Sequence, residues 1–244
     1  MKNQVRLNFS QQHGFPGVIG CIDCTHVAII PPPQNDAEHP EHLYVNRKNY
    51  HSINVQLICD ANLKILNVNA KFPGSTNDAY IWSGSNVQNL LRNLHNAGHK
   101  DYFLLGDSGY PLRTWLLTPL EGDYVPGTPD YNYNVAHKNT RCKIECCNGV
   151  LKNRFRCLLK HRVLHVTPYK ACKIINACIV LHNMCISNNI PEPNNDDLRD
   201  VDFGMFGGYE DEQQEANNIV RRINPELAEG QRSRRNLINR NFVN

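Results

Sequence analysis

The chain has 244 residues, a formal net charge of +3 at pH 7 and an apolar fraction of 41%, which suffices for one large domain with a buried core. It contains no run of about 18 apolar residues, so no membrane-spanning helix is expected. Residues 1–15 lack the apolar stretch of a secretory signal. We therefore expect a protein that stays inside the cell, where its ten cysteines are reduced thiols rather than a disulfide framework.

The first third of the chain predicts β-strands. Residues 18–30 are strongly apolar and end at three consecutive prolines, which predicts a central strand. Residues 34–49 are polar and are predicted to form a loop. Residues 51–72 contain two β-rich runs around the sequence Asp60-Ala61-Asn62, and this arrangement predicts a hairpin with its turn at that point.

The middle of the chain is predicted to alternate helices with short strands. Ser75 or Thr76 is positioned to cap a helix, and a further helix is expected over residues 85–95. Residues 101–105 form a short apolar run followed by the turn sequence GDSG, which predicts a strand. Residues 114–120 are predicted to be a short helix or strand.

The C-terminal half begins with a predicted loop over residues 121–133 and a predicted helix over residues 133–159. Apolar residues recur in that helix at three- and four-residue steps and form one stripe. Glu145 lies about 100° around the helix from Ile144, at the edge of this stripe. A further helix, over residues 169–186, is apolar enough to be buried.

The last fifty residues differ in composition from the rest. Residues 191–215 hold nine acids and residues 221–244 hold six arginines, with little periodicity, and such a segment is predicted to have low order. We expect one catalytic domain over residues 1–190 and an acidic-then-basic, disordered tail over residues 191–244. The elements expected before the tail follow an α/β pattern, a mixed sheet flanked by helices.

Three acids stand where acids are rare. Asp23 interrupts the apolar first strand, Asp107 directly follows the apolar run at residues 101–105, and Glu145 borders a buried helical face. A buried, unpaired carboxylate is costly, and hard divalent cations such as Mg²⁺ or Mn²⁺ compensate it well. We hypothesise that the three carboxylates hold two metal ions about 3.5–4 Å apart, a pair that can cleave phosphodiesters.

Each acid also has an ordinary interpretation. Asp23 could accept hydrogen bonds from backbone N–H groups, and Asp107 could be a turn residue. Glu145 could pair with Arg141 or Lys143 on the same helix.

Positive charge is concentrated between residues 137 and 173, a segment that holds ten Lys or Arg and one acid, Glu145. A basic segment suits a polyanion such as DNA. The alternative is that these side chains lie on the solvated outer faces of helices.

Six blocks of the sequence, in order between about residue 15 and residue 187, resemble the PIF/Harbinger DDE transposases. The blocks are GVIGCIDCTHV, NYHSINVQLICDANLKILNV, FPGSTNDAYIW, FLLGDSGYPLRTWLLTPL, YNVAHKNTRCKIECCNGVLKNRFRCL and IINACIVLHNMCI. They resemble most closely the host-domesticated, Harbinger transposase-derived nuclease group. The resemblance implies an RNase H-like fold and a DDE endonuclease that cleaves DNA with two divalent ions, Mg²⁺ or Mn²⁺.

The resemblance also implies site residues. The metal-binding acids of the family correspond to Asp23, Asp107 and Glu145. Asp78 is a further family position that binds metal, caps the helix after Thr76 or braces the site. His26 could position Asp23 or a phosphate, or be a core imidazole. The candidates for DNA contacts are His26, Lys48, Tyr110, Arg141 and Lys152. A Myb-like DNA-binding partner and a nuclear location, with the cytoplasm as a second compartment, are implied as well.

The chain departs from the family pattern in three places. Family members usually carry a helix-turn-helix region before the catalytic core, whereas this chain begins almost at the core, as a fragment, an isoform or an incomplete gene product would. Asn77 stands where the family often has His. Asn148 replaces the Phe of a Phe-Gly pair, so packing beside the catalytic helix is expected to differ.

Three other functions compete with the nuclease. Cys21, Cys24 and His26 could begin a zinc site that Cys146-Cys147 or His182 and Cys185 complete, although in a strand Cys21 faces away from the other two. A catalytically silent, domesticated transposase could act as a DNA-binding or scaffold protein. The same carboxylates could also hydrolyse some other substrate.

Overall fold

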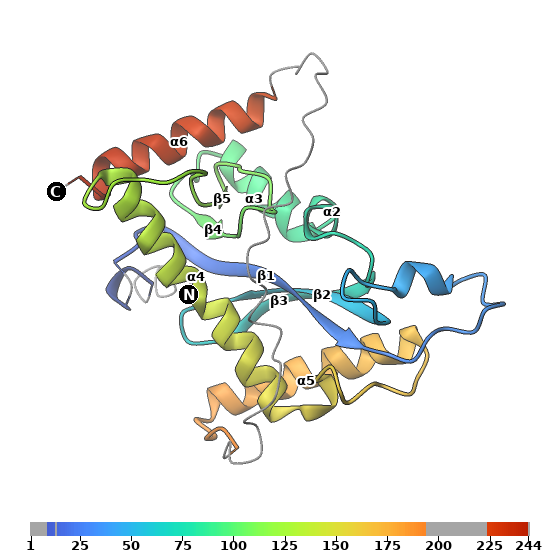
Figure 1. Ribbon diagram of the computed structural model, residues 1–244. Helices are drawn as coiled ribbons and strands as arrows, with labels where there is room; N and C mark the ends of the chain where they lie inside the picture. Colours follow the sequence, from blue (N-terminus) through green and yellow to red (C-terminus); the bar gives the residue numbers. More distant parts are fainter. Residues whose placement is uncertain (1–8, 13, 194–223, 244) are drawn as a thin grey trace.

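The computed structural model describes residues 9–12, 14–193 and 224–243, and its centre is a five-stranded mixed sheet in the order β3-β2-β1-β4-β5 (Figure 1). β1 (Val18–Ala28) pairs antiparallel with β2 (Ser52–Cys59), which pairs antiparallel with β3 (Ile65–Pro73). On its other side β1 runs parallel to β4 (Phe103–Leu105), which runs parallel to β5 (Leu116–Leu117). The predicted α/β class, central strand and hairpin are therefore confirmed.

The hairpin turns where the sequence predicts. The Asp60 carboxylate accepts hydrogen bonds from the backbone N–H groups of Asn62 (2.8 Å) and Lys64 (2.9 Å). Leu63 takes a φ of 63°, a conformation that side chains other than Gly and Asn rarely adopt. The Asp60 bonds therefore help to hold a strained turn between β2 and β3.

Two long helices cover one face of the sheet. α4 (Pro129–Arg154) crosses the sheet diagonally and α5 (Pro168–Ser187) lies against β3 and β2 (Figure 1). α4 starts four residues earlier than expected, because Thr128 caps it and Pro129 suits its first turn. It ends at a short 3₁₀ turn, η2 (Arg156–Leu158). The expected burial of α5 holds for one side only, since Val180, Leu181 and Met184 are exposed.

Two shorter helices cover the opposite face. These are α2 (Asp78–Ser83) and α3 (Asn86–Asn96), and Trp82 of α2 is fully buried against the sheet. The cap of α2 is Asn77, whose side chain accepts the Tyr80 N–H at 2.7 Å, so the predicted capping by Ser75 or Thr76 is wrong. A short 3₁₀ turn, η1 (Glu41–Tyr44), lies in the predicted loop before β2.

The expectation of a disordered tail is wrong for residues 224–243. α6 (Pro225–Asn241) packs against the domain, with Glu226 paired to Arg113 (2.8 Å) and Ile238 fully buried. Gly230 allows this approach, because a Cβ there would lie 3.1 Å from the Arg113 backbone. The rest of the expected tail, residues 194–223, lies outside the described residues.

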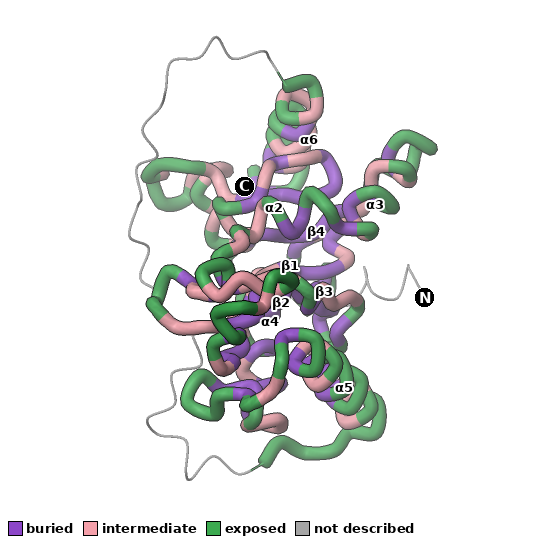
Figure 2. Tube along the Cα trace, turned by 90° about the vertical axis from the view of Figure 1, so that its right-hand side faces the viewer, coloured by how far each residue is buried: buried purple, intermediate pink, exposed green. Residues whose placement is uncertain are grey.

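Burial follows the layers, with buried residues along the strands and exposed residues on the outer sides of the helices (Figure 2). All ten cysteines are free thiols. Four of them, Cys21, Cys59, Cys147 and Cys178, are buried in the core, whereas Cys142, Cys146 and Cys157 are exposed. None of the described helices combines the length and apolar character that a membrane span requires.

Candidate active site

The sheet brings two of the predicted acids side by side. β1 and β4 are parallel neighbours in which Cys21 pairs with Leu105. Asp23 and Asp107 each follow that pair by two residues, so they lie at the same level across the two neighbouring strands. Asp23 is an interior residue of β1, Asp107 lies just beyond the end of β4, and both are partly buried.

Arg141 connects the third acid to the first. Its Nη1 lies 3.6 Å from Oδ2 of Asp23, and its Nη2 donates to Oε1 of Glu145, one helical turn further along α4. The Arg141 side chain is 12% exposed and that of Asp23 is 19% exposed. The guanidinium therefore lies between two carboxylates, and the expectation that Arg141 contacts DNA is not supported by this arrangement.

The acids influence one another strongly. The pKa of Asp23 is raised to about 7, chiefly by burial and also by the nearby carboxylates Asp107 and Asp78, while Arg141 opposes the increase. Burial also raises the pKa of Asp107, again with Arg141 opposing and Asp78 adding to the increase. Asp78 is thus within electrostatic reach of both aspartates. Three carboxylates therefore repel one another while Arg141 offsets the charge of two of them, Asp23 and Asp107, and this arrangement favours binding of a further cation.

Backbone N–H groups orient two of the aspartates. Cys24 N–H donates to Oδ1 of Asp23 at 2.9 Å and Gly109 N–H donates to Oδ1 of Asp107 at 3.0 Å. These bonds and the Arg141–Glu145 pair are the ordinary partners that the sequence left open for each acid. They do not exclude a metal site, because a carboxylate oxygen that accepts one hydrogen bond has a further lone pair for a cation.

The donor atoms suit hard divalent cations, because all four acids offer carboxylate oxygens. In their present arrangement, however, the described side chains include no group of three or more His, Cys, Asp and Glu placed to hold a metal ion. The positive charge between Asp23 and Glu145 is that of Arg141. The residues therefore fit Mg²⁺ or Mn²⁺ in chemistry, and closing around an ion would require Arg141 to release at least one carboxylate.

The zinc alternative is not supported within the described part of the chain. Cys21 donates to the Thr140 carbonyl on the α4 side of the sheet at 3.4 Å. Cys24 lies 3.4 Å from the Tyr110 hydroxyl on the other side, and His26 is bonded to Ser52. The alternation of side chains along β1 places Cys21 on the opposite face from Cys24 and His26, as the strand geometry predicts.

Two predicted DNA contacts are buried, so these predictions are wrong. Tyr110 is 3% exposed and its hydroxyl faces Cys24. Lys152 is 5% exposed and its Nζ donates to the His26 carbonyl at 3.2 Å. Lys48 is exposed, and its contact with DNA stays a prediction.

His26 is the imidazole partner of a hydroxyl. Its Nδ1 lies 3.1 Å from Oγ of Ser52. Burial lowers the pKa of His26 to about 4, while Asp78 opposes that shift and the positive charges of Lys152, Arg47 and Lys48 add to it. The side chain is therefore neutral at pH 7, which favours a positioning role over an ion pair with phosphate.

Asn54 is a site residue that sequence reasoning missed. It is buried in β2, and its Nδ2 donates both to Oδ1 of Asp78 (3.0 Å) and to the Thr76 carbonyl (2.7 Å). It therefore fixes the first turn of α2 and one oxygen of Asp78. A polar residue in the middle of an apolar strand was the available signal.

Residues 22–183 match the pattern of the DDE superfamily endonucleases, a stretch that includes Asp23, Asp78, Asp107 and Glu145. The chain therefore belongs to this family. The proteins named "Putative nuclease HARBI1" from Bos taurus and Homo sapiens are each 42% identical over 180 residues, covering 72% of this chain and 48% of theirs. The resemblance to the Harbinger transposase-derived nuclease group is confirmed.

More distant relatives extend the comparison to plants. The Arabidopsis thaliana "Protein ALP1-like" is 26% identical over 194 residues, covering 75% of this chain and 47% of that protein. The chain thus spans about half the length of the curated relatives it matches. No solved structure matches it.

Proposed function

We propose that this chain is the catalytic core of a divalent-metal-dependent DNA endonuclease that hydrolyses phosphodiester bonds. The observation that carries the proposal is the meeting of Asp23 and Asp107, from adjacent parallel strands, with Glu145 around one guanidinium. Membership of the DDE superfamily endonucleases supports the nuclease chemistry. The strand order β3-β2-β1-β4-β5 supports an RNase H-like fold as part of the same proposal.

Asp23, Asp107 and Glu145 would hold two Mg²⁺ or Mn²⁺ ions, with Asp78 as a supporting ligand. Bound ions of this kind supply an activated nucleophile and neutralise charge on the leaving oxygen. Asp23 has a pKa of about 7, so its carboxyl must lose a proton near neutral pH before its oxygens bind a cation. Arg141 compensates the acids in the arrangement described, and Cys24 N–H and Gly109 N–H keep one oxygen of each aspartate in place.

Cleavage of labelled duplex DNA in Mn²⁺ and Mg²⁺ tests this function. We expect metal-dependent nicking by the unmodified chain and its loss in Asp107→Asn. Asp101→Asn is the matched control, because Asp101 is an exposed acid that precedes β4. Equal nicking by all three proteins would contradict the proposed site.

A catalytically silent DNA-binding or scaffold protein is the second candidate. The Arg141 pairs with Asp23 and Glu145 favour it, because acids engaged in ion pairs can be retained for structure alone. A Myb-like partner would supply further DNA contacts. DNA binding without cleavage in either metal, and without change in Asp107→Asn, would establish this alternative.

We also propose a nuclear location, which rests on membership of a DNA-acting family. Imaging of a fluorescent fusion tests it. Exclusion of the fusion from the nucleus, in the presence of its partners, would contradict it.

A further inference from the structure

A rigid turn before β2 projects two basic residues. Asn46 is buried, and its Oδ1 accepts the backbone N–H groups of Lys48 (2.9 Å) and Tyr50 (3.4 Å). Its Nδ2 donates to Oγ of Ser52 at 2.9 Å, which ties the turn to the first residue of β2. Arg47 and Lys48 follow Asn46 and are exposed. The turn therefore presents two cations from a backbone that is already ordered.

A second exposed basic segment is fastened beside the end of β1. Leu164 N–H donates to the Ala28 carbonyl (3.0 Å) and Ile30 N–H donates to the Leu164 carbonyl (3.1 Å). Leu159 before it is buried. Lys160 and Arg162, between these two anchors, are exposed.

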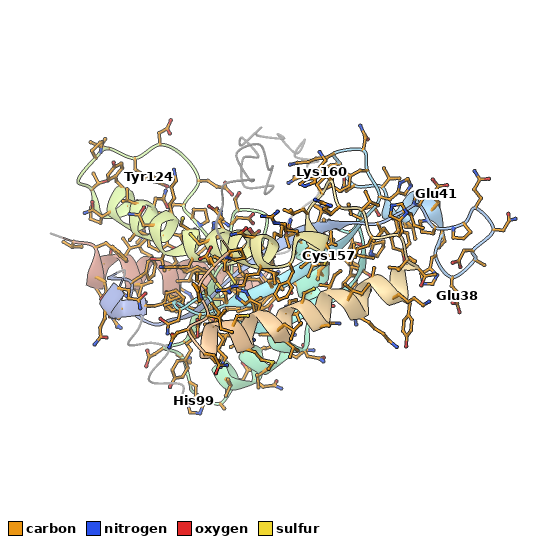
Figure 3. The ribbon with its side chains drawn as sticks, turned by 90° about the horizontal axis from the view of Figure 1, so that it is seen from below. Glu38, Glu41, His99, Tyr124, Cys157 and Lys160 are labelled. Atoms are coloured by element: carbon orange, nitrogen blue, oxygen red, sulfur yellow. The ribbon has the colours of Figure 1, made fainter. Side chains whose placement is uncertain are left out.

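The two segments meet at Tyr50. Nζ of Lys160 lies 5.1 Å from the centre of the Tyr50 ring, within the range of a cation–π contact. The Tyr50 ring also packs edge-on to the ring of His26, with 6.4 Å between ring centres. Lys160 lies in the same half of the molecule as Glu41, away from Tyr124 (Figure 3). We call the four exposed cations Arg47, Lys48, Lys160 and Arg162 the basic rim.

The basic rim is continuous with the acidic site. The Asn46 side chain is bonded to Ser52, Ser52 is bonded to His26, and the Tyr50 ring packs against the His26 ring. Arg47 and Lys48 also act on His26, which shares β1 with Asp23. Positive charge therefore borders the carboxylates on the side of the Asn46 turn.

Acids near the turn are already engaged by histidines. Oε1 of Glu41 lies 3.0 Å from Nε2 of His51, and Oδ2 of Asp36 lies 3.0 Å from Nδ1 of His39. Neither contact involves a cation of the basic rim. The rim therefore keeps its positive field toward solvent.

We propose that the basic rim binds the phosphate backbone of duplex DNA next to the bond held at the acidic site. The proposal rests on the proposed nuclease function for the identity of the polyanion. Exposed Lys and Arg on ordered loops suit phosphates, because they add electrostatic attraction without a cost of ordering the backbone. The carboxylates would repel the same backbone, so flanking cations are needed to bring it close.

The test measures binding apart from cleavage. Fluorescence anisotropy with a labelled duplex in EDTA, over a series of salt concentrations, compares Lys48→Gln/Arg162→Gln with Arg232→Gln/Arg240→Gln. The control pair removes the same charge from exposed positions on α6. We expect the rim variant to bind roughly tenfold more weakly and the slope of log K against log salt to fall by about 2, while the control changes little. Circular dichroism melts establish that both variants are folded.

Each outcome decides one point. Equal weakening by both double variants, or by neither, would overturn the rim as the binding surface. Tighter rim-dependent binding of an RNA duplex of the same sequence would overturn its assignment to DNA. Rim-dependent DNA binding without cleavage in Mn²⁺ would contradict the proposed nuclease function and would support the basic rim as the binding surface. Cleavage that depends on Asp107, together with a rim variant that binds DNA as tightly as the control variant, would support the nuclease function and contradict the basic rim as the binding surface.

Discussion

Two sets of basic side chains lie near the acids, and they differ in what surrounds them. Arg141 and Lys152 extend from α4 toward β1, where the guanidinium meets the carboxylates of Asp23 and Glu145 and the ammonium meets the carbonyl of His26. The cations of the basic rim extend from two loops into solvent. The inner set, Arg141 and Lys152, therefore compensates local groups. The outer set, which is the basic rim, is available to a partner, so the same residue types serve both purposes.

The largest expected difference between the sets is in stability. Lys152→Ala removes a buried ammonium and leaves the His26 carbonyl without that donor, so we expect a loss of about 2–4 kcal/mol in the free energy of unfolding. Urea denaturation measures it. A loss below that of a surface variant would show that Lys152 is not part of the inner set.

Arg141→Gln tests how far the inner cation Arg141 stabilises the cluster of acids around it. Removing the guanidinium leaves the repulsion of Asp23 by Asp107 and Asp78 without its compensating charge, so we expect a loss of about 1–3 kcal/mol in the free energy of unfolding at pH 8 in EDTA. Added Mn²⁺ should recover more stability in this variant than in the unmodified chain, because the ion no longer competes with Arg141. Thermal melts with and without Mn²⁺ measure both effects, and Lys143→Gln is the control. Equal recovery in all proteins would contradict competition between Arg141 and the metal.

Asp23→Asn should stabilise the metal-free protein at high pH. The folded-state pKa of Asp23 is raised from 3.8 to about 7, so the native state holds this proton more tightly than the unfolded state does. The contribution of Asp23 to stability is therefore full below about pH 4 and is lost as pH rises through about 7. Asn does not titrate, so the variant should be about 1–2 kcal/mol more stable than the unmodified chain at pH 8.5 in EDTA. No gain at pH 8.5 would contradict a raised pKa.

The smallest expected effect belongs to the outer set. Lys48→Gln alters an exposed side chain, so we expect a change within about 0.5 kcal/mol in the free energy of unfolding. Denaturation under the conditions used for Lys152→Ala measures it. A loss as large as that of Lys152→Ala would remove the distinction between the two sets.

Sequence patterns predicted the sheet and the acids for a physical reason. A central strand such as β1 is covered on both faces and therefore reads as a continuous apolar run, against which Asp23 is conspicuous. The same logic found Asp107 after β4 and Glu145 beside Ile144. Each of these acids is recognised by the apolar residues next to it in the chain, so local sequence patterns are enough to predict it.

Other features depend on packing between distant segments. Lys152 and Tyr110 were expected at the surface, but only the placement of α4 and the loop after β4 against β1 buries them. α6 resembled a charged tail because few of its residues face the domain, among them Gly230 and Ile238. Local composition could not reveal contacts with Arg113, which is more than a hundred residues away in the chain.

The meeting of three acids at one catalytic site is tested most directly by single-turnover cleavage of a labelled duplex in Mn²⁺. Asp107→Asn should lower the cleavage rate by at least about a hundredfold, because it removes one anionic ligand from the pair of ions. It should bind the duplex in EDTA as the unmodified chain does, and Asp101→Asn should cleave normally. Cleavage by Asp107→Asn at the rate of the Asp101→Asn control would show that the carboxylates gathered around Arg141 are not the catalytic site.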